Sequence, residues 1–248
     1  MNFSYSAVWN DAVAMIKRHG ALLAAIAGVF IFLPILLTGY LLPAPTSETD
    51  PLGVLTTYYR ENWIWLLLGT IVNALGAIAI YRLLFAGSRV TVGQAIGGAL
   101  ALLPGYVAMS IIVSLALGVG FLALVIPAIY LLGRLTTAAP AMVAENRANP
   151  IAAIAASWRL SAGKGWAVAG LILVVAVAGV IVAFVVTALV GLVVVLAVGR
   201  DGIGELVLLL VGAAANSALY VVLIVLIAAI YRALRGETTP QVDLTKGI

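Results

Sequence analysis

The chain contains runs of apolar sequence longer than a helix of a soluble protein can bury. Residues 21–42 and 165–199 carry no charge, and 44 consecutive uncharged residues lie between Arg89 and Arg134. A bilayer core about 30 Å thick is crossed by about 20 apolar residues of helix. With 65% apolar and 9% charged residues, the chain also lacks the polar side chains of a soluble surface. We therefore expect an all-α, polytopic membrane protein.

Six spans are predicted as three hairpins, each preceded by an amphipathic helix in the membrane interface. The long middle stretch divides at Leu117-Gly-Val-Gly120 into two short spans. The six predicted spans are residues 21–42, 63–84, 104–118, 119–138, 166–195 and 206–231. The predicted interfacial helices are residues 1–19, 91–103 and 150–162. Together they form a single integral membrane domain, residues 1–248.

The basic residues indicate the direction of the spans, because cytoplasmic loops collect Lys and Arg. With six spans and a cytoplasmic N-terminus, eleven of the thirteen Lys and Arg residues lie inside, and only Arg60 and Arg200 lie outside. If the middle stretch were one span, eight of the thirteen would lie outside. The asymmetry predicts a plasma-membrane protein with both termini in the cytoplasm.

A similar sequence recurs near the ends of three spans, which suggests a threefold internal repeat. The three copies are Ala79-Ile80-Tyr81-Arg82, Ala128-Ile129-Tyr130 with Arg134 following, and Ala229-Ile230-Tyr231-Arg232. Interfacial tyrosines and snorkelling arginines are favoured at any membrane boundary. Duplication and convergence therefore both explain the pattern.

Few polar residues lie within the predicted spans, and none of them is acidic. Gly69 with Asn73, and Gly212 with Asn216, place a small residue and an amide on one helix face. This spacing favours helix–helix packing in lipid. The alternative is a polar transport path, with Pro34 and Pro127 interrupting the first and fourth spans.

The sequence offers little material for catalysis. It has no cysteine and one histidine, which excludes thiolate chemistry, cysteine-based metal sites and histidine clusters. The cytoplasmic acids are scattered over separate segments. We therefore expect no catalytic, cofactor or metal site, no enzymatic activity and no nucleic-acid partner. The basic cytoplasmic face predicts contact with anionic membrane lipids, at roughly 1 kcal/mol per Lys or Arg.

The most distinctive segment runs from Tyr130 to Trp166. It reads Tyr130-Leu-Leu-Gly-Arg134-Leu, then Ala139-Pro140 and Glu145, then Ala152-Ala-Ile-Ala-Ala-Ser157-Trp158-Arg159-Leu-Ser-Ala-Gly163. It resembles the membrane-domain family of glycerophosphoryl diester phosphodiesterases and related bacterial inner-membrane proteins, in which such a run joins two transmembrane hairpins. The resemblance implies a bacterial inner-membrane module, without an activity, because the family's name comes from a catalytic domain fused to this module. The motif positions it marks are Arg134, Pro140, Glu145, Ser157, Trp158 and Gly163.

Physical reasoning suggests roles for this segment. Pro140 is expected to end or bend the fourth span, and Glu145 to lie at the water line and pair with Arg134, Arg147 or Arg159. A structural clamp between the interfacial helix and the bundle, and a pocket for lipid headgroups that includes Arg159, are the two alternatives.

Two functions remain open. The first is a non-enzymatic scaffold, an accessory subunit of a larger membrane complex or homo-oligomer, or a lipid-organising module. The alternative is a transporter or permease for a small or lipidic substrate. A polar cavity lined by Asn73, Asn216 and Ser114 would favour transport, and a tightly packed bundle would favour the first function.

Overall fold

A computed structural model describes residues 3–42, 50–85, 92–199 and 202–237, and every regular element in these ranges is helical. Six helical stretches within them are long and apolar enough to cross a membrane, which confirms the expected all-helical class. The elements are α1 (Tyr5–Ala27), the π-helical turn η1 (Gly28–Phe32), α2 (Leu33–Leu41), α3 (Pro51–Phe85), α4 (Val92–Ala123), α5 (Val125–Leu135), α6 (Ala138–Ala144), α7 (Pro150–Leu160), α8 (Gly165–Val198) and α9 (Ile203–Arg235).

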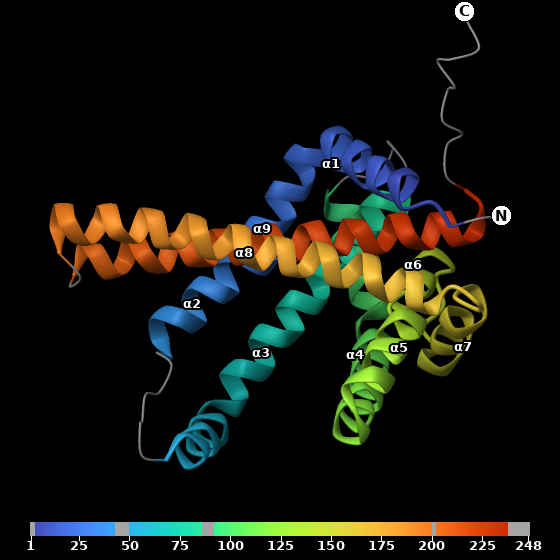
Figure 1. Cartoon of the computed structure of the whole chain (residues 1–248), viewed down its shortest axis with the longest axis horizontal. Helices are drawn as coiled ribbons and strands as arrows, with labels where there is room; N and C mark the ends of the chain where they lie inside the picture. Colours follow the sequence, from blue (N-terminus) through green and yellow to red (C-terminus); the bar gives the residue numbers. More distant parts are fainter. Residues whose placement is uncertain (1–2, 43–49, 86–91, 200–201, 238–248) are drawn as a thin grey trace, which may run out of the picture.

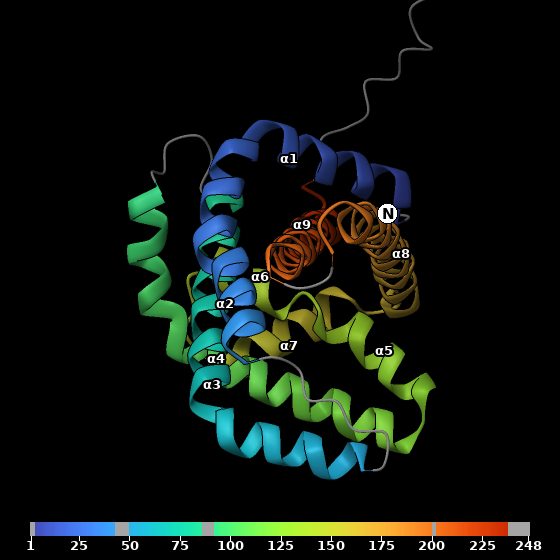
Figure 2. The ribbon, with the colours of Figure 1, turned by 90° about the vertical axis from the view of Figure 1, so that its left-hand side faces the viewer.

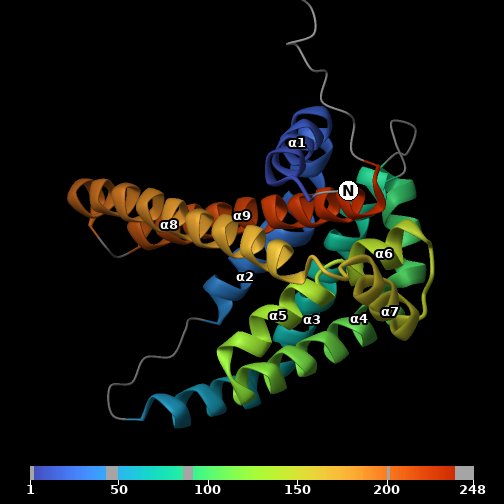
Figure 3. The same cartoon turned by 45° about the vertical axis from the view of Figure 1, so that its right-hand side comes forward.

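The helices meet at one end of the molecule and diverge from it. Figure 1 shows α8 and α9 side by side in one direction, with α3 and the pair of α4 and α5 leaving at other angles. The start of α1, the end of α9, α6 and α7 gather where they meet, and Figure 3 shows the same divergence from another side. We call this region the junction end.

The buried core lies at the junction end. Residues 77–81 of α3 and 228–231 of α9 are all buried there. In contrast, no described residue of α8 beyond Ile172 is buried, although this part of the helix is almost wholly apolar. Exposing such a surface to water would cost about 25 cal/mol per Å². The diverging helices therefore present the kind of surface that the hydrocarbon interior of a membrane covers.

The predicted interfacial helix 1–19 and span 21–42 do not form separate helices. The Ser4 hydroxyl accepts a hydrogen bond from the Ala7 N–H (3.4 Å) and caps the start of α1, which then continues without a break to Ala27. No proline or polar turn stands between the two predicted segments, and the single Gly20 is tolerated in a helix. The helix bends and is not interrupted, and after the bend the chain turns toward α2 (Figure 2).

Pro34 widens the first span without breaking it. Proline lacks an N–H and its ring clashes with the carbonyl four residues earlier. The helix adjusts through η1, where the Leu33 N–H bonds the Gly28 carbonyl five residues back. Gly76 of α3 faces this turn, since a Cβ there would lie 2.6 Å from the Cβ of Phe30.

The second helix begins earlier than the predicted residues 63–84. The Asp50 carboxylate accepts a hydrogen bond from the Gly53 N–H (2.9 Å), a typical N-cap, and α3 runs from Pro51 to Phe85. Its first turns carry Tyr59, Trp63 and Trp65, which are all exposed. Residues 51–62, which include charged and polar side chains, are therefore helical although hydrophobicity alone excludes them from the span.

The predicted segments 91–103, 104–118 and 119–138 are divided differently in the structure. Pro104 lies inside α4, which runs from Val92 to Ala123 and changes direction along its length (Figure 2). The turn is at Leu124, which is extended, and Pro127 lies in the first turn of α5, where its missing N–H has no cost. Gly120 is helical, and its missing side chain lets α5 approach, because a Cβ would lie 2.9 Å from Leu131 Cδ1.

Pro140 lies in the first turn of a helix, whereas the sequence suggested that it ends or bends one. Helix α5 already ends at Leu135, and Pro140 lies in the first turn of α6, where proline is tolerated. The chain then reaches α7, which covers most of the predicted helix 150–162. Asn149 caps α7 by accepting hydrogen bonds from Ile151 N–H (3.0 Å) and Ala152 N–H (3.2 Å).

The last two helices are longer than the predicted spans 166–195 and 206–231. Helix α8 has 34 residues and is unbroken at Gly191, so it is about 51 Å long. Gly191 faces α9, because a Cβ there would lie 3.3 Å from Leu208 Cδ2. The length therefore has to be accommodated by tilt or by protrusion from the membrane.

Candidate functional site

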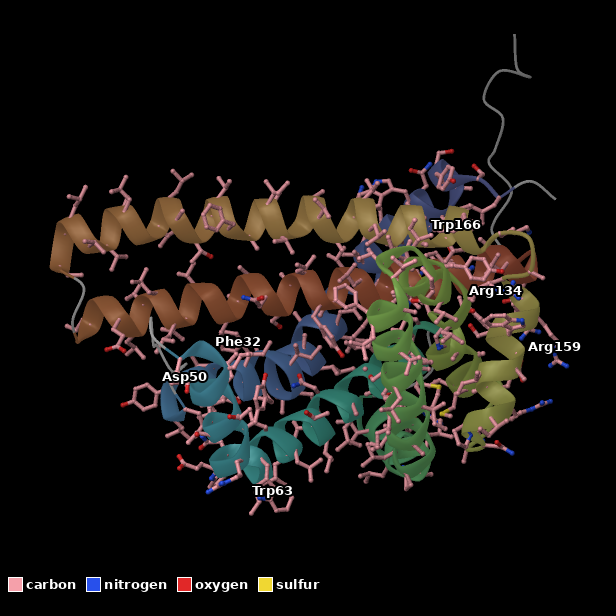
Figure 4. All side chains as sticks on the ribbon, turned by 60° about the horizontal axis from the view of Figure 1, so that its bottom comes forward. Phe32, Asp50, Trp63, Arg134, Arg159 and Trp166 are labelled. Carbon is pink, nitrogen blue, oxygen red and sulfur yellow. The ribbon has the colours of Figure 1, made fainter. Side chains whose placement is uncertain are left out.

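The structure gathers most of the motif residues at the junction end. Arg134 lies in the last turn of α5, and Pro140 lies in α6. Ser157, Trp158 and Arg159 lie on α7. Figure 4 shows Arg134, Arg159 and Trp166 together at this end, with Asp50 and Trp63 at the other. Gly163 lies just after α7 and has a positive φ of 70°. Glycine adopts this backbone conformation at lower cost than a residue with a side chain.

Hydroxyl groups hold the end of α5 against α7. The Ser157 hydroxyl donates to the Arg134 carbonyl (2.7 Å) and accepts from the Thr137 hydroxyl (2.8 Å). The Ser161 hydroxyl lies 2.7 Å from the Ser157 carbonyl and 3.2 Å from the Arg134 carbonyl. Thr137, Ser157 and Ser161 are completely buried. Carbonyls in the last turn of a helix have no partner within it, so these serines satisfy a group that burial would otherwise penalise.

The side chain of Arg134 stacks on aromatic rings. Its guanidinium carbon lies 4.2 Å from the centre of the Trp158 ring and 5.9 Å from that of Tyr130. Arg134 is only 6% exposed, and its Nε has no hydrogen-bond partner in the described part of the chain. A cation over an aromatic face is attracted by the ring quadrupole. Arg134 therefore does not reach water, although the sequence suggested a snorkelling arginine, and of the three suggested partners of Glu145 it is not the one that pairs.

Glu145 pairs with Arg147, one of the three partners that the sequence suggested. The two side chains are 3.4 Å apart, and Arg147 is largely exposed. On its other side, Glu145 borders a pocket of about 330 Å³. The remaining lining residues of this pocket are Ala156, Arg159, Leu160 and Arg235.

Arg235 is a member of this pocket that the sequence analysis missed. It donates to the Tyr231 hydroxyl (2.8 Å) and pairs with Glu237 (2.9 Å). Arg159 has no ion-pair or hydrogen-bond partner among the described residues. The sequence carried no signal for Arg235, because only the folded chain brings the end of α9 next to α7.

Three arginines near the ends of α3, α5 and α9 contact the three segments that the sequence predicted as interfacial helices. Arg82 donates to the Gly98 carbonyl (3.4 Å) and to the Asn146 Oδ1 (3.3 Å). Arg134 stacks on Trp158, and Arg232 pairs with Asp11 (3.3 Å). The contacted segments belong to α4, α7 and α1. Each arginine thus reaches the segment that precedes the next pair of helices, and the last arginine reaches the first segment.

The contact between Asp11 and Arg232 provides a test of this arrangement. Arg232→Gln is expected to lower the free energy of unfolding by about 1 kcal/mol, because the Asp11 carboxylate loses its cation and already has one buried oxygen without a partner among the described residues. Chemical unfolding in mixed micelles measures the change. Glu237→Gln is the matched control, since its ion pair with Arg235 is exposed and surface pairs contribute little. Equal effects of the two substitutions would contradict a structural role for the Asp11 contact.

The predicted packing residues lie apart from the junction-end site. A Cβ on Gly69 would lie 3.8 Å from Thr38 Oγ1 of α2, which is ordinary contact distance. Asn73 is partly buried, and its Oδ1 has no partner among the described residues. Gly212 has open space around it, and Asn216 donates to the Gly212 carbonyl of its own helix (2.9 Å). The second pair therefore does not join two helices in the structure, although Gly212 borders a groove between α2 and α9.

Within the described ranges, no group of three or more metal-ligating acids, histidines or cysteines lies together. Comparison with protein-family models, curated proteins and solved structures finds no match to this chain.

Proposed function

We propose that this chain is a non-enzymatic, multi-pass protein of a bacterial inner membrane that organises lipids by holding anionic headgroups at its junction end. The pocket between α7 and α9 is the observation that carries the proposal. Arg159 and Arg235 both border it together with Glu145, whose charge is paired with Arg147, while Ala156 and Leu160 supply apolar walls. Arginine forks bind phosphate oxygens in pairs, and membrane phosphates lie at the boundary between apolar and aqueous surroundings.

Aromatic residues at the same end of the molecule support a position of the pocket at the membrane interface. Trp158 and Trp166 are partly exposed, and Tyr130 packs edge-on against Trp158 with ring centres 6.3 Å apart. Tryptophan and tyrosine are enriched at the level of lipid headgroups. A headgroup seated by Arg159 and Arg235 therefore lies where the neighbouring side chains favour the membrane interface.

We further propose that the junction end faces the cytoplasm and that both termini lie there. The helix ends and loops that gather at this end carry most of the cations of the described chain. These are Arg82, Arg134, Arg147, Arg159, Lys164, Arg232 and Arg235. Arg60 lies in the first turns of α3, close in sequence to Trp63, which Figure 4 places at the opposite end. The distribution follows the excess of Lys and Arg in cytoplasmic segments.

The lipid-binding proposal is tested by removing the two cations. The double variant Arg159→Gln with Arg235→Gln is expected to lose anionic lipid about tenfold or more, because each cation near the surface contributes about 1 kcal/mol. Native mass spectrometry counts dioleoyl phosphatidylglycerol and dioleoyl phosphatidylcholine bound to the protein in mild detergent. Arg60→Gln is the control for a lost charge elsewhere. Equal retention of phosphatidylglycerol by the wild type and the double variant would refute the pocket.

The remaining expectations of the sequence stay proposals. A protein partner or a second copy of the chain fits the exposed apolar faces of α8 and α9, but these faces also fit lipid. A threefold duplication agrees with the arginine contacts described above. Transport has one supporting observation, a cavity bordered by Ser114, although neither Asn73 nor Asn216 lines it.

A further inference from the structure

A second cavity, about 320 Å³ in volume, lies among α3, α4, α5, α6 and α9. It is separate from the basic pocket and shares no lining residue with it. No charged side chain lines it, and most of its wall is apolar. Its polar side chains all carry hydroxyl groups. They belong to Tyr81, Tyr106, Ser110, Ser114, Thr136 and Tyr220.

The three tyrosine hydroxyls have no hydrogen-bond partner among the described residues. Tyr81 is only 2% exposed, yet its hydroxyl makes no hydrogen bond to any described residue. Tyr106 is partly buried and Tyr220 is 40% exposed, and their hydroxyls are also without a partner in the described ranges. A buried tyrosine hydroxyl normally finds a hydrogen-bond partner, because leaving it unpaired is costly. These hydroxyls line the cavity and are available to donate to a ligand that enters it.

An apolar groove adjoins the cavity. The groove has a volume of about 690 Å³ and lies between α4, α5 and α8. Leu117 and Leu132 line both spaces, so the two meet at these side chains. Its other walls include Phe121, Val125 and Leu173, and none of its lining residues is polar. The combination suits a ligand with a small polar end and a long apolar part.

We propose that the cavity and the groove together bind one uncharged lipid whose carbonyl oxygens accept hydrogen bonds from the tyrosine hydroxyls. A charged headgroup is disfavoured, because the cavity has no counter-charge and burial of an unpaired ion is costly. A carbonyl oxygen has two lone pairs and accepts from two hydroxyls at once. Carbonyls of this kind occur both in the ring of a quinone and in the esters of a diacylglycerol.

This inference does not depend on the proposed headgroup site. The two pockets share no lining residue, and only the pocket between α7 and α9 is lined by charged side chains. The lipids proposed for them also differ. Loss of phosphatidylglycerol binding in the Arg159 and Arg235 variant therefore leaves the binding of a neutral lipid intact. Each proposal can fail while the other holds.

The test removes the hydroxyls while keeping the rings. Native mass spectrometry in detergent titrates the purified chain with ubiquinone-1 and with dioctanoylglycerol. We expect at least one of the probes to bind with a stoichiometry of one. Tyr106→Phe with Tyr220→Phe is expected to weaken this binding about tenfold, equivalent to about 1.4 kcal/mol. Binding of only one probe identifies the source of the carbonyl, and binding of both shows that the site accepts either.

Two controls separate binding from folding. Tyr40→Phe removes a hydroxyl from an exposed tyrosine of α2 and should leave binding unchanged. Gly118→Leu should fill the groove and weaken binding, whereas Gly97→Leu, a glycine in the same helix that does not border the groove, should not; neither Cβ would meet an atom within 4 Å. If neither probe binds the wild type, or if the double tyrosine variant binds as tightly as the wild type, the proposal is wrong.

Discussion

Gly133→Val is expected to lower the free energy of unfolding by about 3 kcal/mol. Helices α5 and α8 cross at this residue, and a Cβ on Gly133 would overlap the backbone carbonyl oxygen of Gly165. The same Cβ would lie 3.0 Å from the Cβ of Ala169. A carbonyl inside a helix cannot rotate away, so the two helices must separate along their contact. Small residues at such crossings are how helices pack closely in lipid.

The separation would also disturb the neighbouring site. A Cβ on Gly165 would lie 2.8 Å from Arg134 Cδ, so Arg134 is seated against the same crossing. Chemical unfolding in mixed micelles, followed by circular dichroism, measures the loss of stability. Gly170→Val is the matched control, because Gly170 lies on α8 with no atom within 4 Å of its Cβ position. A loss of similar size in both variants would show that α5 and α8 do not meet at Gly133.

The double variant Ser157→Ala with Ser161→Ala is expected to lower the free energy of unfolding by about 2–3 kcal/mol. It leaves the buried Arg134 carbonyl without a donor and the Thr137 hydroxyl without its acceptor. Ser157→Ala alone should account for most of the loss, because the Ser161 hydroxyl lies closer to the Ser157 carbonyl than to the Arg134 carbonyl.

Thr70→Ala provides the comparison for these serines. Its hydroxyl donates to the Leu66 carbonyl at 2.8 Å, but within one helix and at an exposed position. We expect its loss to cost less than about 0.5 kcal/mol, the usual range for a surface substitution. The same unfolding measurement applies to all three variants. If the serine variants are as stable as Thr70→Ala, the hydroxyl contacts do not hold α5 against α7.

The sequence predicted which segments are helical better than it predicted where one helix becomes the next. Hydrophobic runs identify helices that are long and apolar enough to cross a membrane, and this holds for α8 and α9. A junction between helices depends on single residues whose effect changes with position. Pro104 bends a helix from inside, whereas Pro127 and Pro140 lie in first turns, where a missing N–H has no consequence. The pattern of the sequence does not distinguish these cases.

The candidate site shows the same division between local and distant information. The cap of α7 at Asn149 follows from local sequence, because Asn before Pro is a typical helix start. The stacking of Arg134 on Trp158 and the arrival of Arg235 beside Arg159 depend on contacts between residues far apart in the chain. The hydroxyl cavity was missed because its tyrosines lie on three different helices. Of its members, only Ser114 was placed in a possible cavity by the sequence, and Tyr81 was considered only as part of the repeat.

The ion pair between Asp11 and Arg232 has a consequence for biosynthesis. Asp11 leaves the ribosome long before Arg232, so the first helix enters the membrane while its ionic partner does not yet exist. Until α9 is inserted, the carboxylate has to remain at the water boundary, where hydration replaces the missing cation. Once α9 is inserted, Arg232 pairs with Asp11 and holds α1 in place. A chain interrupted before α9 therefore lacks the ion pair that holds its N-terminal helix against the bundle.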